Sequence, residues 1–517
     1  MLRHPLQLLA SRGARARYSF MMSDTSSPKA PIRAIVSRFS YDFSKQAMEQ
    51  VFSRMPFSFC GIISVGRDPD FFSGIPTESQ EWFCSSDIRS GIYDNVDWST
   101  VLPLDQKILG SLRECESVFM DIVGRLEWKR SVSYRQRHDW YHRHVRFWND
   151  YLTRNNINLF ISAWLPHEIP DIIIYHLCKL RGIPVLYFHT SSVRDISFTE
   201  HDIRESAIQI EKRYEELLKE FQNETNPDNI PLTPLFADRF SALTRKAGEK
   251  PPVESVKRKT YWGIVRELCI HKPLQFLESV LGYFTPSGVL RAFGAIHRSR
   301  LIKERNRFYD AHAIQPDFSE AFVYLPLHFQ PEASTVPMGG AYADQILLAE
   351  LLSTRLPKDV LIYIKEHPRQ SSWLDRTTQD YQRLIALPNV RLIARDVDTF
   401  QLREQCRAVA TVTGSAGFEA LFRGKPVLLF GFRFYQYARG VFRIHSAEDL
   451  KKAIHQIFKE GAAPTLTEAR LYLKAMEETG IRGVLNPWHM KVTGMPKEEH
   501  VENNTEAIVE ELQRICG

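Results

Sequence analysis

The chain has 517 residues, of which 44% are hydrophobic and 25% are charged. This composition is typical of a globular protein, and because a single core usually stops growing near about 250–300 residues, we expect two domains. The formal net charge of +6 is too mild to indicate a nucleic-acid partner. The seven cysteines are scattered, without a CxxC pair, so neither a zinc site nor a disulfide framework is predicted, and a reducing cytosol is favoured.

Residues 1–30 are expected to be a disordered leader that does not take part in the fold. The first 22 residues contain four arginines and no acidic residue, which is the composition of an organellar transit peptide. An untranslated leader, with the true start at Met21 or Met22, explains the same composition. No later run reaches the roughly 18 apolar residues of a membrane-spanning helix.

Residues 31–198 show the alternation of an α/β domain. Short β-branched and apolar runs alternate with longer amphipathic ones, which predicts a parallel sheet covered by helices on both faces. The expected strands are 32–36, 57–65, 118–122, 159–163 and 184–188, and the expected helices are 43–55, 135–154 and 169–181.

The strand pattern stops over residues 199–315, where helical spacing rich in lysine, arginine and glutamate predicts a helical insertion or linker. Its segment 250–307 combines basic residues with apolar ones. Such a surface could rest on anionic lipid, and a solvated helical face is the alternative.

A second doubly wound domain is predicted over residues 316–480, and a helical tail over 481–517 is expected to pack back on the first domain. The strands of the second domain are expected at 321–327, 360–364, 390–393, 408–412 and 426–430. The helices are expected at 344–355, 373–384, near 400, at 417–423 and at 447–459.

Ligands of open α/β sheets bind beyond the carboxyl ends of the strands, so we looked for polar residues at those points. The first strand of the second domain is followed by His328, Gln330 and Glu332. These side chains can offer donors and acceptors to a sugar or a phosphate. An ordinary polar turn explains them equally well.

The next strand ends in Lys365, Glu366 and His367, and Pro368 follows directly. The proline stops the strand and restrains the backbone of the histidine. An imidazole held beside a lysine can bind a nucleotide phosphate or assist its departure. A structural histidine is the alternative.

A loop of small residues, Thr413, Gly414 and Ser415, separates a later strand from its helix. Small residues let backbone N–H groups approach an anion near a helix N-terminus. Glu419 could accept hydrogen bonds from sugar hydroxyls, although a carboxylate near a helix start is favourable without a ligand. Tyr435 could form a pocket wall. The loop is neither a Walker A nor a GxGxxG motif, which argues against a P-loop ATPase and a classical dehydrogenase.

In the first domain, His167 and Glu168 follow a strand, and Asp171 lies about one turn into the next helix. An imidazole and a carboxylate at this edge are candidates for acid–base chemistry that faces the interdomain cleft. A helix cap is the alternative.

The segments LHFQPEAST, IKEHP, TGSAGFEAL and GKPVLLFG, in this order and spacing, resemble the bacterial capsular polysaccharide biosynthesis and export family, which includes Kdo transferases. The resemblance is specific over about residues 322–450 and looser over 157–188. It implies a GT-B fold, in which two Rossmann-like domains face a cleft and the second holds the nucleotide. It also implies a glycosyltransferase with no bound cofactor or metal.

The resemblance implies roles for individual residues. His367 and Pro368 match a motif that contacts the nucleotide phosphate, Ser415 matches a second phosphate contact, and Glu419 matches a residue that binds hydroxyls. The base that deprotonates the acceptor is expected to be Glu168 or His167, with Asp171 orienting it.

These features together predict a transferase that moves a sugar, such as Kdo or another acidic sugar, from a nucleotide donor to a glycan or lipid-linked acceptor. A CMP-linked donor is favoured and a UDP-linked one is the alternative. The expected location is the cytoplasm, including the inner face of the membrane. A polyol-phosphate transferase, a sugar-nucleotide epimerase and a non-catalytic polysaccharide-binding or export protein remain open.

Overall fold

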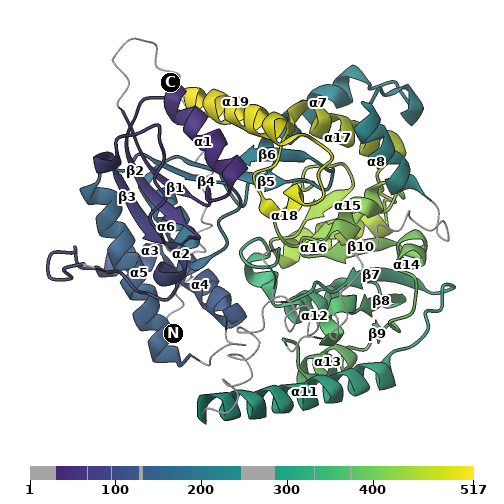
Figure 1. Ribbon diagram of the computed structural model, residues 1–517. Helices are drawn as coiled ribbons and strands as arrows, with labels where there is room; N and C mark the ends of the chain where they lie inside the picture. Colours follow the sequence, from purple (N-terminus) through teal and green to yellow (C-terminus); the bar gives the residue numbers. More distant parts are fainter. Residues whose placement is uncertain are drawn as a thin grey trace, which may run out of the picture.

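Two β-sheets, each with helices packed against it, dominate the computed structural model (Figure 1). The structure describes residues 31–66, 68–94, 96–126, 132–245, 286–330, 332, 334–372 and 375–516. Within these residues the first sheet has the strand order β13-β6-β5-β4-β1-β2-β3 and the second the order β12-β11-β10-β7-β8-β9. This is the mixed α/β architecture expected from the sequence. The leader at 1–30 and most of the basic segment at 250–307 lie outside the described residues.

Most of the first sheet is parallel, and its carboxyl edge therefore collects the ends of neighbouring strands. The antiparallel strands are β6, which pairs with β5, and β13, which pairs with β6. The strands are β1 (Ile32–Ser37), β2 (Phe57–Ser64), β3 (Gln80–Cys84), β4 (Leu159–Ser162), β5 (Val185–Thr190), β6 (Ile196–Glu200) and β13 (Ile481–Arg482).

Helices cover this sheet and bury aromatic side chains against it. The long helix α5 starts at a capping box formed by Ser133 and Gln136, and α6 ends at Gly182, whose φ of 67° suits glycine. The helices are α1 (Asp42–Arg54), α2 (Ser85–Arg89), α3 (Gln106–Ser111), α4 (Arg113–Leu126), α5 (Tyr134–Arg154) and α6 (Ile169–Arg181), and a 3-10 turn, η1 (Thr77–Ser79), precedes β3.

The strand predicted at 118–122 is wrong, because these residues lie inside the helix α4. The buried side chains of this helix are Cys115, Phe119, Ile122 and Val123. Their spacing of four, three and one follows the 3.6-residue period of a helix, and a window of five residues was too short to reveal it.

The segment between the two sheets is helical, with α7 (Ile208–Glu220), α8 (Pro234–Thr244) and α11 (Pro286–His312), and a 3-10 turn, η2 (Pro227–Asn229). The helix α11 lies along the lower edge of the second domain in Figure 1 and contacts α13 (Thr378–Ile385). No helix in the described part of the chain combines the length and apolarity needed to cross a membrane.

All neighbours in the second sheet pair in parallel. Its strands are β7 (Ala321–Pro326), β8 (Val360–Lys365), β9 (Val390–Leu392), β10 (Ala408–Thr411), β11 (Val427–Leu429) and β12 (Val441–Arg443). Its other helices are α12 (Gln345–Arg355), α14 (Thr399–Gln405), α15 (Ser415–Leu421) and α16 (Ala447–Phe458), with the 3-10 turns η3 (Gly340–Ala343) and η4 (Pro368–Ser372).

Two predicted helices of this domain begin at other residues than expected. The helix predicted over 373–384 starts only at Thr378, where Thr377 and Asp380 form a capping box, and Trp373 lies outside the described residues. The helix predicted over 417–423 spans Ser415–Leu421, because the small residues before Gly417 are already helical.

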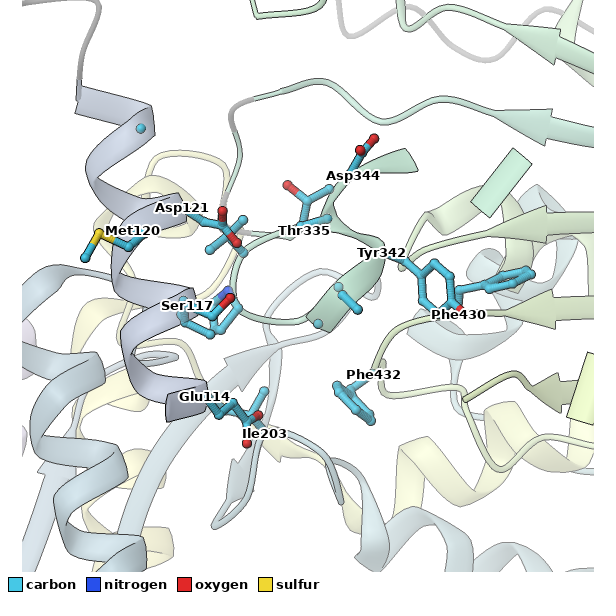
Figure 2. A pocket seen from close by; sticks show the side chains of 18 of the residues that line it. Glu114, Ser117, Met120, Asp121, Ile203, Thr335, Tyr342, Asp344, Phe430 and Phe432 are labelled. Atoms are coloured by element: carbon cyan, nitrogen blue, oxygen red, sulfur yellow. The ribbon is translucent and has the colours of Figure 1, made fainter. Parts of the chain in front are cut away.

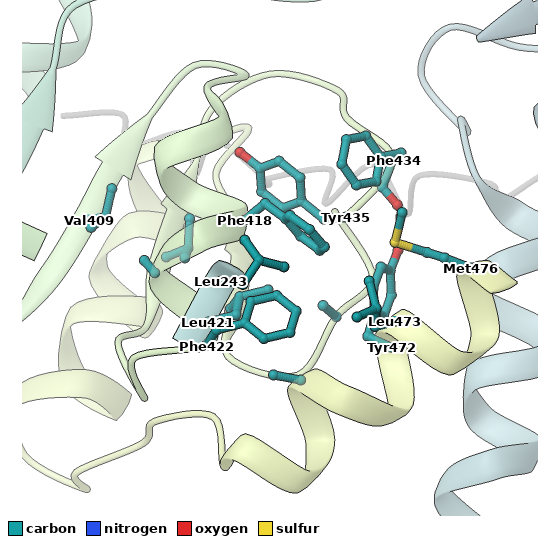
Figure 3. Close-up of a cluster of buried hydrophobic side chains, with 14 of the residues drawn as sticks. Leu243, Val409, Phe418, Leu421, Phe422, Phe434, Tyr435, Tyr472, Leu473 and Met476 are labelled. Atoms are coloured by element: carbon teal, nitrogen blue, oxygen red, sulfur yellow. The ribbon is translucent and has the colours of Figure 1, made fainter. Parts of the chain in front are cut away.

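After the second sheet the chain continues through α17 (Leu466–Thr479) and then returns to the first domain. There β13 joins the edge of the first sheet, and α18 (Pro487–Met490) and α19 (Lys497–Cys516) follow, with α19 packed on α1. Helix α17 packs on α7 and buries Tyr472, Leu473 and Met476 in the cluster that also holds Phe418 and Phe422 (Figure 3). One core therefore joins the middle segment, the second domain and α17.

Replacing Leu473 by alanine tests this shared core. Leu473 is fully buried, so Leu473→Ala should lower the free energy of unfolding by about 2–5 kcal/mol. Leu347 on α12 is 43% exposed, and Leu347→Ala should change it by no more than about 0.5 kcal/mol. The midpoint of urea unfolding measures both, and equal shifts would contradict the burial of α17.

Candidate functional site

The carboxyl edges of the two sheets meet at an interdomain contact. Arg433, which follows β11, donates from Nη1 to Nε2 of His189 in β5 over 2.9 Å. The loop after β7 also reaches across, because its Val336 and Met338 lie in the hydrophobic cluster of the first domain. Both sets of strand-end residues therefore face the same region between the domains.

His328 organises the strand ends of the second domain. Its Nε2 lies 3.2 Å from the backbone N of Thr413, which donates to it, and 3.1 Å from Oγ1 of Thr411. An Nε2 that accepts places the proton of the neutral ring on Nδ1. Burial, with Arg376 and Arg433 nearby, lowers the pKa of His328 to about 3, so the ring is neutral at physiological pH.

The small-residue loop before α15 is held by the protein's own groups. Thr411 Oγ1 accepts from the backbone N–H of Gly414 over 3.0 Å, and the hydroxyl of Tyr435 donates to the Gly414 carbonyl over 2.5 Å. A Cβ at position 414 would lie 2.8 Å from Thr411 Oγ1, so glycine is required. Thr413 donates from Oγ1 to the carbonyl of Ser334 over 2.7 Å. Ser415, in contrast, is exposed and open to a ligand.

Glu419, on the same helix as Ser415, forms an ion pair with Arg403, with 2.8 Å between Oε2 and Nη1. Its side chain is 27% exposed. A hydroxyl-bearing ligand could therefore reach it only beside the arginine.

Lys365 and Glu366, predicted to face a ligand, are both committed to buried internal contacts. Lys365 donates from Nζ to the carbonyl of Val397, and burial lowers its pKa. Glu366 accepts from Arg395 Nη2 over 2.5 Å and from the Tyr381 hydroxyl. These contacts give both residues a structural role.

His367 and Pro368 lie at the rim of the second sheet. The backbone N–H of Arg369 donates to Nδ1 of His367 over 3.2 Å, which leaves the ring proton on Nε2. The ring lies 5.7 Å from that of Phe329, and burial lowers its pKa. Pro368 is exposed and begins η4. The half-buried imidazole can act as a neutral donor.

Gln330 and Glu332 differ in their surroundings. Gln330 donates from its backbone N to Gln370 Oε1 over 2.9 Å and from Nε2 to the carbonyl of Ala343 over 2.6 Å, so it braces the loop after β7. Glu332 is exposed and accepts from Ser334 Oγ over 3.0 Å.

The carboxylates of the first domain form an ion cluster around Arg38. Asp171 accepts from Ser37 Oγ over 2.7 Å and from Arg38 Nε over 2.9 Å, and only 1% of it is exposed. Glu168 pairs with Arg38 Nη2 at 3.2 Å and with Arg89. Burial pushes the pKa of Glu168 up, but the two arginines together hold it below its usual value. Glu168 is therefore ionised at neutral pH.

His167 is better suited than Glu168 to accept a proton. Its Nδ1 lies 2.7 Å from the carbonyl oxygen of Leu165, which can only accept, so Nδ1 carries the proton. The basic nitrogen is then Nε2. Glu168, whose pKa is held down by two arginines, is a weak base.

A cavity of about 1470 Å³ opens between α4 and α6 of the first domain and the loop 335–346 of the second (Figure 2). In Figure 2, Glu114, Ser117 and Asp121 on α4 lie opposite Thr335 and Asp344. Of the predicted site residues, Gln330 alone is in the described lining. The other strand-end residues therefore lie beside this cavity and not in its wall.

Four arginines that hold the region together were not predicted from the sequence: Arg38, Arg89, Arg376 and Arg433. Arg38 directly follows β1, and Arg433 lies four residues beyond β11, so a stricter use of the strand-end rule could have found both. Arg89 is the last residue of α2, and Arg376 lies between η4 and α13, so neither directly follows a strand.

Residues 300–484 match the family described as "Capsule polysaccharide biosynthesis protein". The match includes the loops after β7, β8 and β10 that hold the strand-end residues. No curated protein sequence matches the chain.

Solved structures that are similar to this chain include two of KpsC from Thermosulfurimonas dismutans. The beta Kdo 2,7 transferase is 11% identical, with 75% of this chain and 95% of that chain covered and a TM-score of 0.29. The beta Kdo 2,4 transferase is 15% identical, with coverages of 61% and 79% and a TM-score of 0.29. The UDP-GlcNAc 2-epimerase of Neisseria meningitidis, bound to UDP-GlcNAc, is 12% identical, with coverages of 94% and 100% and a TM-score of 0.25.

Arg38 and Arg89 both pair with Glu168, so replacing each of them by alanine in turn tests the ion cluster around Arg38. Arg38→Ala leaves Asp171 buried and unpaired and should lower the free energy of unfolding by about 3–5 kcal/mol at pH 7. The side chain of Arg89 is 33% exposed, so Arg89→Ala should lower the free energy of unfolding by at most about 1 kcal/mol.

The loss of stability in Arg38→Ala should shrink as the pH falls through the lowered pKa of Glu168, because the protonated carboxyl no longer attracts the cation. Urea unfolding from pH 7 to pH 3 measures this, and a pH-independent difference would contradict the pairing.

Proposed function

We propose that the chain is a glycosyltransferase that moves a sugar from a nucleotide donor onto a growing capsular or surface polysaccharide, or onto its lipid-linked acceptor. The match of residues 300–484 to the capsule polysaccharide biosynthesis family carries this proposal. Arg433 and the loop after β7 in that segment contact the first domain, which supports it further.

In the proposed reaction an acceptor hydroxyl attacks the anomeric carbon of the donor. The new C–O bond forms, the bond between the anomeric carbon and the phosphate oxygen breaks, and the hydroxyl proton passes to Nε2 of His167. The departing phosphate gains negative charge, which the half-buried guanidinium of Arg433, the Nε2–H of His367 and the hydroxyl of Ser415 would stabilise. A CMP-linked donor of an acidic sugar is favoured over a UDP-linked one, on the resemblance of the motifs.

Removing the base should reduce turnover without reducing stability. His167→Gln should lower the rate of transfer by about 10²–10⁴-fold, while the melting temperature and the donor affinity stay the same. His455→Gln, an exposed histidine on α16, is the control and should behave like the wild type. Release of free nucleotide in the presence of acceptor measures the rate, and unchanged turnover in His167→Gln would remove His167 from the mechanism.

A donor screen separates the competing functions. With radiolabelled CMP-, CDP- and UDP-linked donors, a transferase releases nucleotide in proportion to the added acceptor. An epimerase needs no acceptor and leaves the nucleotide attached to its sugar. A polyol-phosphate transferase carries phosphate to the product, and a binding protein shows affinity for glycan with none for nucleotide.

We further propose that the N-terminal half of α11 binds an anionic membrane surface. Phe293 and Ile296 are 66% and 52% exposed, and at 3.6 residues per turn Arg300 and Lys303 lie on the same side of the helix. Basic residues beside exposed apolar ones attach helices to anionic lipid.

Vesicle sedimentation tests the membrane proposal. Wild-type protein should sediment with vesicles of phosphatidylglycerol and phosphatidylcholine and much less with phosphatidylcholine alone. The double variant Phe293→Glu, Ile296→Glu should lose about tenfold in affinity, because it removes apolar area and adds negative charge. Phe318→Glu, at a residue 38% exposed outside α11, should have little effect. Equal binding by both variants would contradict the proposal.

A further inference from the structure

The wall of the interdomain cavity contains two buried side chains with donors that find no partner within the described residues. Arg376 is 3% exposed and Gln345 is 1% exposed, and both line the cavity. Neither Nη1 of Arg376 nor Nε2 of Gln345 has a hydrogen-bond acceptor in the described part of the chain. Buried donors without a partner are rare in folded proteins, which points to a ligand that supplies the acceptors.

The same two side chains fix the backbone of His328 from both sides. Gln345 Oε1 accepts from the His328 N–H over 2.6 Å, and Arg376 Nη2 donates to the His328 carbonyl over 2.6 Å. In each side chain one polar atom thus holds the backbone of His328, while another has no hydrogen-bond partner within the described residues. Their positions are fixed before any ligand arrives, which lowers the entropic cost of binding.

Arg376 is a buried cation of this wall with an unpartnered donor. Of the other arginines and lysines in the described lining, Arg204 pairs with Glu114 at 2.5 Å, Lys179 pairs with Asp202 at 2.7 Å, and Arg137 donates from Nε to the carbonyl of Val132 over 3.1 Å. Burial lowers the pKa of His176 to about 4 and also lowers that of His445, so both are neutral.

Most acidic groups near Arg376 are already occupied. Asp344 caps α12 by accepting from the N–H of Ile346 over 2.9 Å, and Asp380 accepts from the N–H of Thr377 over 2.7 Å. Asp375 is exposed and also lines the cavity, and its carboxylate interacts electrostatically with Arg376 without a direct ion pair in the described residues. Nη1 of the guanidinium is therefore left as a hydrogen-bond donor for a ligand.

The size and the surface of the cavity indicate what kind of ligand it takes. About 1470 Å³ exceeds the roughly 300–1,000 Å³ of a pocket for one small molecule, so a chain of several units fits. Tyr342 and Phe432 contribute aromatic surface, and Ser117 and Thr335 contribute hydroxyls. Aromatic faces beside hydrogen-bonding groups suit sugar rings, which have apolar faces and polar edges.

We propose that this cavity is the binding site for the acceptor glycan, and that Arg376 and Gln345 bind an acidic sugar of that glycan through its carboxylate. The assignment rests on the proposed glycosyltransferase function and deepens it by naming the acceptor class. The acceptor enters between α4 and the loop 335–346, and its carboxylate receives the hydrogen bonds of Arg376 Nη1 and Gln345 Nε2. Through these two side chains, occupancy of the cavity also reinforces the position of His328.

Calorimetry with trigalacturonic acid and with neutral maltotriose tests this assignment on the full-length protein. Wild-type protein should bind trigalacturonic acid at least about tenfold more tightly than maltotriose, because only the former offers carboxylates. Gln345→Glu keeps an oxygen that accepts from the His328 N–H, and it replaces the unpartnered Nε2 donor with a negative charge. The affinity for trigalacturonic acid should therefore fall about tenfold or more.

Ser117→Trp fills the cavity from the exposed face of α4 and should also weaken trigalacturonic acid binding. Ser111→Trp, at an exposed serine on α3 outside the described lining, is its matched control and should bind like the wild type. Because both substitutions are at exposed positions, melting temperatures near the wild-type value will show that the proteins are folded.

The outcomes separate the cavity assignment from the proposed function. The assignment is overturned if trigalacturonic acid does not bind, if it binds Gln345→Glu and Ser117→Trp as tightly as the wild type, or if CMP displaces it competitively. If trigalacturonic acid binds as expected while no nucleotide is released from any donor, the assignment of the cavity stands and the transferase proposal fails.

Discussion

The burial of the loop after β7 in the core of the first domain is the interaction on which the arrangement of the site depends. Val336 is 7% exposed and Met338 is 1% exposed, and their apolar surface is removed from water only while the two domains stay together. The same loop provides Ser334, which accepts from Thr413, and leads into η3 and α12. Hydrophobic burial therefore sets where the polar strand ends of the two sheets meet.

The sequence predicted the architecture well where amphipathic periodicity ran over long windows. The helices over 135–154 and 169–181 and the strands of the second sheet follow from patterns that buried faces impose. Short windows failed for two reasons. The apolar residues of 118–122 fit a strand and a helix equally, and β3, β12 and β13 are short edge strands, of which β13 pairs with the distant strand β6.

The candidate site was predicted only in outline. The strand-end rule located His328, His367 and Ser415, because the chemistry of parallel sheets concentrates polar residues there. It could not separate side chains that face a ligand from side chains that the protein uses internally. Lys365 and Glu366 are residue types that often bind ligands, yet the protein holds both in internal contacts with residues far away in sequence. Only tertiary contacts decide this.

The way the chain returns to the first domain limits how the interdomain cleft can open. The chain leaves the first sheet after β6 and comes back at β13, and these two strands are paired, while the helices beyond them, α7 and α17, are packed together. Both connections therefore cross at one place, where Gly480 lies so close to Ile196 that a Cβ would meet it at 2.7 Å. Such a double crossing acts as a two-stranded hinge. Two adjacent connections restrict the relative movement of the domains more than a single linker would, so any opening of the cleft would pivot at this point.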